Sequence, residues 1–235
     1  MRMMVAPTVV FDLDGTLVDS APDLAATLNI IFAREGLPPV AYDTARKLVG
    51  GGARSMIERS LAAQGRKLDT PAVDGLVKGF IDHYAAHIAD RSRVFPGLEA
   101  ALDELAAGGC RFAVCTNKLE WLSVRLLDAL GLANRFAAIC GADTFGLQKP
   151  HPDSLRRTIA RAGGEPAHAV MVGDSLSDIA AARAAGVPVV AVDYGYAETP
   201  VSELAPDRVI SALTELPSTV FELLRAGSPT AAERR

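Results

Sequence analysis

The chain has 235 residues, of which 49% are hydrophobic and 22% charged, and its formal net charge is −4. This length and composition are typical of a globular protein that buries a substantial core, as one large domain or a domain with an insert. The net negative charge gives no reason to expect nucleic acid or an anionic membrane as a partner, so an anionic ligand requires a local binding site. No apolar run nears the length that spans a bilayer and no cleavage site is evident, so we expect a cytoplasmic protein.

Short apolar runs alternate with helical patterns along most of the chain. The first run, Val5–Leu13, contains several β-branched residues and ends at an Asp-Gly pair, as a buried strand does. Four later runs are expected to form strands, at residues 111–116, 137–141, 169–173 and 187–192. Each follows a stretch with helical periodicity, at residues 98–107, 121–130, 153–162 and 178–185. This alternation predicts right-handed βαβ units, and therefore an α/β fold with a parallel sheet covered on both faces.

The segment 20–93 interrupts the alternation. It has no strand-like run and shows helical patterns at residues 21–34, 42–48, 54–64 and 72–88. One crossover connection usually needs a single helix, so this segment is too long to be one. We therefore expect a helical cap over residues 20–93, a catalytic core over 1–19 and 94–225, and a flexible tail over 226–235.

Two carboxylates stand where the first expected strand ends. Asp12 and Asp14 are two residues apart, so in an extended stretch both side chains point to the same side. Two neighbouring carboxylates repel each other unless a cation or a shared proton lies between them. The pair therefore favours binding of a hard divalent ion such as Mg²⁺. A strand that simply ends in an Asp-Gly turn has the same sequence pattern, so Asp12 and Asp14 alone do not establish a metal site.

Polar residues also follow three later apolar runs. Thr116 and Asn117 open an expected helix, where a hydroxyl and backbone N–H groups can bind phosphate or simply cap the helix. Lys149 lies in a loop stiffened by two prolines and can neutralise a carboxylate and a phosphate oxygen, although most loop lysines are merely solvated. Asp174 can reach a metal, and Asp178 can orient a metal-bound water or brace Lys149. Ligands of open α/β sheets bind at the carboxyl ends of strands, so the coincidence of these residues favours one catalytic site.

These residues resemble the four signature motifs of the haloacid dehalogenase superfamily. The motifs are Asp-x-Asp-Gly-Thr, a Ser or Thr after the second strand, a Lys, and Gly-Asp-x-x-x-Asp, and the resemblance covers roughly residues 8 to 195. It implies a Rossmann-like core with strand order 5-4-1-2-3 and a helical cap inserted after the first motif.

The resemblance also implies a role for each matching residue. Asp12 resembles the nucleophile that forms an aspartyl-phosphate, and Asp14 resembles the general acid and base. Thr116 and Lys149 resemble the groups that hold the phosphoryl oxygens. Asp12, Asp174 and the backbone carbonyl of Asp14 resemble the Mg²⁺ ligands. The implied reaction is an in-line displacement that depends mainly on positioning and charge neutralisation.

Finer features resemble the phosphoglycolate phosphatase family. They are the segments 17–24, 49–53, 149–153 and 194–196. This resemblance implies a phosphatase that converts 2-phosphoglycolate to glycolate and phosphate. Asn117, Gly15 and Thr16 are expected near the phosphate, and Arg54 with the amides of the turn 50–52 near the substrate carboxylate. That turn reads Gly-Gly-Gly where the family pattern suggests Gly-Asn-Gly.

Other functions stay open at this stage. A related capped phosphatase for a sugar phosphate, pyrophosphate or pyridoxal phosphate fits the same motifs, as does a phosphosugar mutase. A non-catalytic phosphate-binding homologue fits less well, because a pure binder does not need the acid and base Asp14. The expected partner is a small phosphorylated metabolite, not nucleic acid or a membrane, and the chain is expected to be a monomer or dimer. Three cysteines cannot all pair, and their apolar surroundings favour reduced buried thiols.

Overall fold

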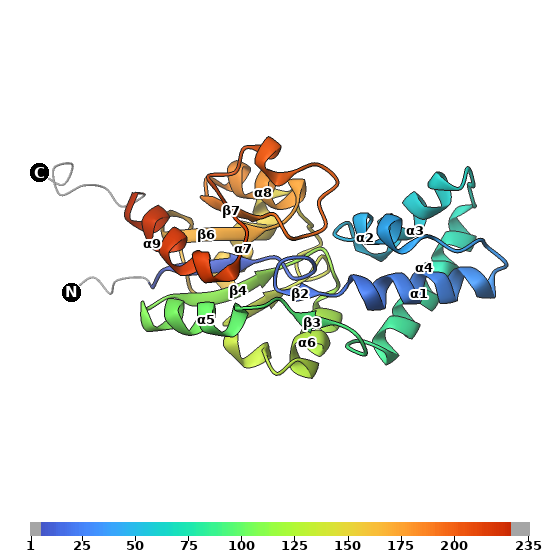
Figure 1. Ribbon diagram of the computed structural model, residues 1–235, viewed down its shortest axis with the longest axis horizontal. Helices are drawn as coiled ribbons and strands as arrows, with labels where there is room; N and C mark the ends of the chain where they lie inside the picture. The colour runs from blue at the N-terminus through green and yellow to red at the C-terminus, as the bar shows by residue number, and fades with distance from the viewer. Residues whose placement is uncertain (1–5, 227–235) are drawn as a thin grey trace, which may run out of the picture.

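A six-stranded parallel sheet forms the centre of the larger part of the molecule in a computed structural model that describes residues 6–226 (Figure 1). The strands are β1 (Thr8–Phe11), β4 (Arg111–Cys115), β5 (Ala138–Cys140), β6 (Ala169–Gly173), β7 (Val189–Val192) and β8 (Arg208–Ile210). Their order is β5-β4-β1-β6-β7-β8, and every neighbouring pair is parallel. The predicted fold class and the predicted order 5-4-1-2-3 are therefore confirmed for the first five strands. The sixth, β8, is an edge strand with two of its three side chains exposed, so it has no apolar run to reveal it.

Helices cover both faces of this sheet because successive strand side chains point to opposite sides. Val9 and Phe11 pack in one apolar cluster with α5 (Leu98–Ala107), α6 (Glu120–Ala129) and α9 (Leu216–Ala226). Val10 packs in another with α7 (Pro152–Arg161) and α8 (Leu176–Ala185). Short 3-10 helices occupy Ala133–Arg135, Pro166–His168, Val201–Leu204 and Leu213–Glu215.

Four helices form the smaller part of the molecule, at the right of Figure 1. They are α1 (Ala21–Arg34), α2 (Tyr42–Lys47), α3 (Gly52–Ala63) and α4 (Thr70–Ala86). Proline in the first turn suits the start of α1, and the Asp69 carboxylate accepts a hydrogen bond from Ala72 N that caps α4. We call this part the cap; its predicted boundaries at 19/20 and 93/94 stay a prediction. The predicted flexible tail lies outside the described residues from position 227 onward.

Two short strands join the cap to the core. β2 (Val18–Asp19) and β3 (Arg93–Val94) pair antiparallel, with Asp19 opposite Arg93. Arg93 was expected in a segment without strands, but a two-residue strand is too short to show a period of two. Within residues 6–226, no helix has the length and apolar character needed to cross a membrane.

Candidate active site

Asp12 lies directly after β1, with its backbone N–H continuing the sheet by donating to Val172 O of β6 (2.9 Å). Its carboxylate is buried, and its Oδ1 is 2.8 Å from Lys149 Nζ. The same ammonium is 2.6 Å from Asp178 Oδ1 in the first turn of α8. The Lys149 ammonium is therefore held between two carboxylates that come from different strand ends.

Three buried carboxylates meet at this point. Oxygen atoms of Asp12, Asp174 and Asp178 all lie within 4.8 Å of one another. Burial raises the pKa of Asp12 to about 7 despite the adjacent Lys149, and burial with the negative charges of Asp12 and Asp178 raises the pKa of Asp174 to about 8. A single ammonium does not balance three carboxylates, and their hard oxygen ligands suit a hard divalent cation. The expected ligand set included Asp12 and Asp174; the structure adds Asp178 to the acidic cluster.

The Asp-Gly-Thr turn positions Asp174. The hydroxyl of Thr16 donates to Asp174 Oδ1 (3.2 Å), and Tyr196 N donates to Asp174 Oδ2 (2.7 Å). Gly15 has φ +87°, and a Cβ there would lie 2.4 Å from Asp174 Oδ2. Both the backbone conformation and the space therefore require glycine at position 15. Thr16 contacts the acidic cluster through its side chain, so its expected place beside the phosphate stays a prediction.

Thr116 and Asn117 follow β4, as expected, but differ in what they contact. Thr116 Oγ1 accepts a hydrogen bond from Lys118 N (3.2 Å) within its own turn. The Asn117 side chain exchanges hydrogen bonds with the Lys149 backbone, donating to Lys149 O (3.1 Å) and accepting from Lys149 N (2.8 Å). It also donates to Gly50 O in the cap (3.1 Å). Asn117 thus fixes the loop that carries Lys149 and connects that loop to the glycine turn of the cap.

Asp14 points toward the cap instead of toward the acidic cluster. Its Oδ1 accepts from Ser20 Oγ (2.5 Å) and lies 2.8 Å from Lys118 Nζ. Lys118 Nζ also donates to the hydroxyl of Tyr84 in α4 (3.2 Å). Lys118 and Tyr84 are missing from the expected site. Lys118 follows the Thr116-Asn117 pair directly, so its place at a strand end could have revealed it; nothing in the sequence pattern distinguishes Tyr84 from a core residue.

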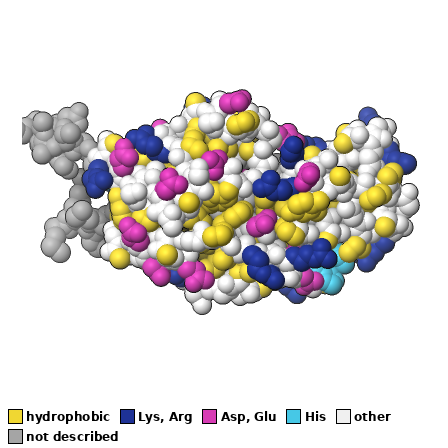
Figure 2. All heavy atoms as spheres, in the orientation of Figure 1, with side chains coloured by type: hydrophobic (Ala, Val, Ile, Leu, Met, Phe, Trp, Pro, Cys, Tyr) yellow, Lys and Arg dark blue, Asp and Glu magenta, His cyan; other side chains and the backbone are white. Residues whose placement is uncertain are grey.

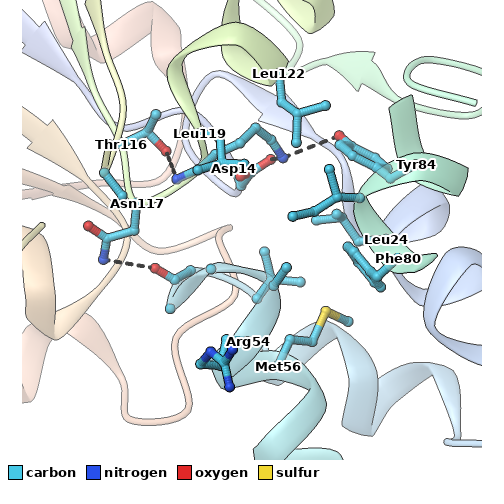
Figure 3. Close-up of a pocket in the computed structure, with 18 of the residues that line it drawn as sticks. Asp14, Leu24, Arg54, Met56, Phe80, Tyr84, Thr116, Asn117, Leu119 and Leu122 are labelled. Atoms are coloured by element: carbon cyan, nitrogen blue, oxygen red, sulfur yellow. Dashed lines mark hydrogen bonds and ion pairs between the residues drawn. The ribbon is translucent and has the colours of Figure 1, made fainter. Parts of the chain in front are cut away.

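A cavity of about 240 Å³ lies between the core and the cap, shown in Figure 3. The core side of its wall contains Asp12, Asp14 and Thr116, and the cap side contains the turn 49–53 and apolar side chains of α3 and α4. Arg54 is also on the wall, but its guanidinium pairs with Asp74 and Glu58 and is about half exposed (47%). In Figure 3 Arg54 lies on the side of the cavity opposite Asp14.

Known proteins resemble this chain over most of its length. The model of the family described as haloacid dehalogenase-like hydrolase matches residues 9–192. The chain is 48% identical over 217 residues to a phosphoglycolate phosphatase of Caulobacter vibrioides, covering 92% of each chain. It is 49% identical to a phosphoglycolate phosphatase of Mesorhizobium japonicum, covering 95% of this chain and 99% of the other. A crystal structure from Haemophilus somnus, described as a predicted phosphoglycolate phosphatase, superposes with a TM-score of 0.85 at 29% identity, covering 92% of this chain and 99% of the other.

Proposed function

The chain belongs to the haloacid dehalogenase-like hydrolase family, and we propose that it is a Mg²⁺-dependent phosphatase that hydrolyses 2-phosphoglycolate. The observation that carries the proposal is the pairing of Asp12 with Lys149 beside Asp174, next to a cavity that Asp14 also lines. The substrate is carried over from relatives named phosphoglycolate phosphatase that match nearly the whole chain.

Asp12 is the proposed nucleophile. Its carboxylate oxygen attacks phosphorus, the bond from phosphorus to the ester oxygen breaks, and an aspartyl-phosphate forms. Lys149, 2.8 Å away, offsets the charge on Asp12 and on the phosphoryl oxygens. Thr116 gives a hydroxyl at the strand end next to Asp12, where it can hold a phosphoryl oxygen. Asp178 keeps Lys149 aimed through its 2.6 Å ion pair.

Asp14 is the proposed acid and base. It gives a proton to the leaving glycolate oxygen, and later takes a proton from the water that attacks the aspartyl-phosphate and regenerates Asp12. Its position on the cavity wall, two residues after Asp12, supports this role because the leaving group must face the cavity.

The acidic cluster would hold Mg²⁺. Asp12 and Asp174, with the backbone carbonyl of Asp14, are the proposed ligands, and Asp178 lies close enough to orient a metal-bound water. When bound, the ion supplies positive charge that keeps Asp12 ionised and offsets charge on the phosphoryl oxygens.

A panel of small phosphate esters tests the proposal. With Mg²⁺ present, kcat/KM is expected to be highest for 2-phosphoglycolate among phosphoglycolate, sugar phosphates, pyrophosphate and pyridoxal phosphate. Equal kcat/KM values for all these esters would contradict 2-phosphoglycolate as the substrate but not the phosphatase activity. Failure to turn over any ester, with no phosphorylated Asp12 trapped, would contradict the phosphatase itself.

A further inference from the structure

Lys118 places a buried ammonium group on the wall of the cavity. Its side chain is only 6% exposed and comes from the turn after β4. Two of its three N–H groups have partners, Asp14 Oδ1 at 2.8 Å and the Tyr84 hydroxyl at 3.2 Å. Its Nζ also lies 4.6 Å from the centroid of the Tyr84 ring, which holds the ammonium from the cap side. Within residues 6–226 no acceptor is seen for the third N–H.

Few positively charged side chains lie on this wall. Among the described residues that line the cavity, the side-chain cations are Lys118 and Arg54. Arg54 is about half exposed and paired with two acidic residues, so moving it onto a ligand would break those pairs. Much of the remaining surface near Lys118 is apolar, from Leu24, Phe80 and Leu122. A carboxylate entering such a surface is stable only next to a buried positive charge.

Lys118 lies where the carboxylate of a bound phosphoglycolate is expected. In that ester one carbon separates the leaving oxygen from the carboxylate. Asp14 must reach the leaving oxygen to protonate it, and Lys118 Nζ is 2.8 Å from Asp14. A carboxylate one carbon beyond that oxygen therefore lies within reach of the Lys118 ammonium.

We propose that Lys118 and the hydroxyl of Tyr84 bind the carboxylate of the substrate and select phosphoglycolate over esters that lack it. The inference rests on the proposed function. The Lys118 ammonium donates to the Tyr84 oxygen, which leaves the Tyr84 O–H free to donate to the carboxylate. Burial raises the pKa of Tyr84 to about 12, so the hydroxyl keeps its proton at neutral pH. In Figure 3 this hydroxyl is turned toward Asp14, into the cavity.

The test compares two esters of equal length, 2-phosphoglycolate and ethyl phosphate. The preference is the ratio of their kcat/KM values, so any loss caused by moving Asp14 affects both and cancels. Lys118→Met should lower the preference about 100-fold. Tyr84→Phe should lower it about tenfold by removing one hydrogen bond. Glycolate should inhibit ethyl phosphate turnover by the wild-type protein and lose this effect in Lys118→Met.

The outcomes separate this inference from the function on which it rests. A wild-type protein without preference for phosphoglycolate rejects the proposed substrate, on which the inference rests. A wild-type preference that survives in both Lys118→Met and Tyr84→Phe rejects the inference alone, as does its loss in Arg54→Ala instead. Lys78→Met is the matched control, because Lys78 is exposed on α4 and pairs with Asp82. If Lys118→Met does not fold, Tyr84→Phe decides: both the preference for phosphoglycolate and the inhibition by glycolate should weaken about tenfold, and unchanged values would reject the inference.

Discussion

Asp14 and Asp12 are two residues apart in an Asp-x-Asp pattern, yet the structure gives them different partners. Asp12 faces Lys149, whereas Asp14 faces Lys118 and Ser20. This difference agrees with two separate proposed roles, a nucleophile beside the acidic cluster and an acid beside the cavity.

Asp14→Asn tests the proposed role of Asp14 as acid and base. Turnover of phosphoglycolate should fall by about 100- to 10,000-fold, because an amide neither donates a proton to the alkoxide nor activates water. p-Nitrophenyl phosphate has a leaving group that needs no protonation, so it should release about one equivalent of nitrophenol per enzyme and then nearly stop. If the Asp14→Asn variant kept the wild-type rate of steady-state turnover, Asp14 would not be the acid and base. Asp103→Asn, an exposed side chain paired with Arg135, is the control.

Asp23 holds together the two ends of the cap. It lies in the first turn of α1, and its buried carboxylate accepts hydrogen bonds from Arg91 N, Ser92 N and Ser92 Oγ. The helix that leaves the core is thus bonded directly to the segment that returns to it.

Asp23→Ala should destabilise the protein by about 2–3 kcal/mol, because it leaves buried N–H and O–H groups without an acceptor. Chemical denaturation gives the free energy of unfolding. Asp43→Ala is the control, since Asp43 is also in a first helical turn but is exposed, and the change there should stay below about 1 kcal/mol. Equal losses in the two variants would show that only the helix dipole matters.

On the face of the molecule shown in Figure 2, acidic and basic side chains are interspersed, with Lys and Arg side chains near the junction of core and cap and no continuous patch of one sign. Among the described residues, Asp12, Asp174 and Asp178 form a buried cluster of carboxylates.

Mg²⁺ should therefore stabilise the whole fold. At a Mg²⁺ concentration 100 times its Kd, binding adds about 2.7 kcal/mol, which corresponds to a rise in Tm of roughly 5–10 °C over protein in EDTA. The rise should disappear in Asp174→Asn, and an equal rise in that variant would contradict the assigned ligand. Thermal denaturation in EDTA and in Mg²⁺ measures both.

The three thiols should be protected in the folded protein. Cys110, Cys115 and Cys140 are free and buried, and burial raises the pKa of each. A higher pKa means less thiolate, so at pH 8 a thiol reagent should react slowly with native protein and titrate three thiols after denaturation. Fast labelling of the native chain would contradict this burial.

Features that depend on residues close together in the sequence could be predicted, whereas contacts between distant elements could not. The first five core strands and the residues at their ends were predictable because buried parallel strands are apolar runs that stop at polar residues. β8 was not, since its exposed edge position needs no apolar run. The contact of Tyr84 with Lys118 joins residues from different elements across the junction of cap and core, and no period in either segment encodes it.

The pairing of β2 with β3 brings the two ends of the cap together. Because Asp19 lies opposite Arg93, the chain enters and leaves the cap at neighbouring points, and the core sheet keeps its connections whatever lies between them. Closing a long loop between adjacent points costs little more entropy than closing a short one. A different insert grafted between β2 and β3 should therefore leave the core sheet intact, and because the cap forms one wall of the cavity, the graft should change which esters fit there.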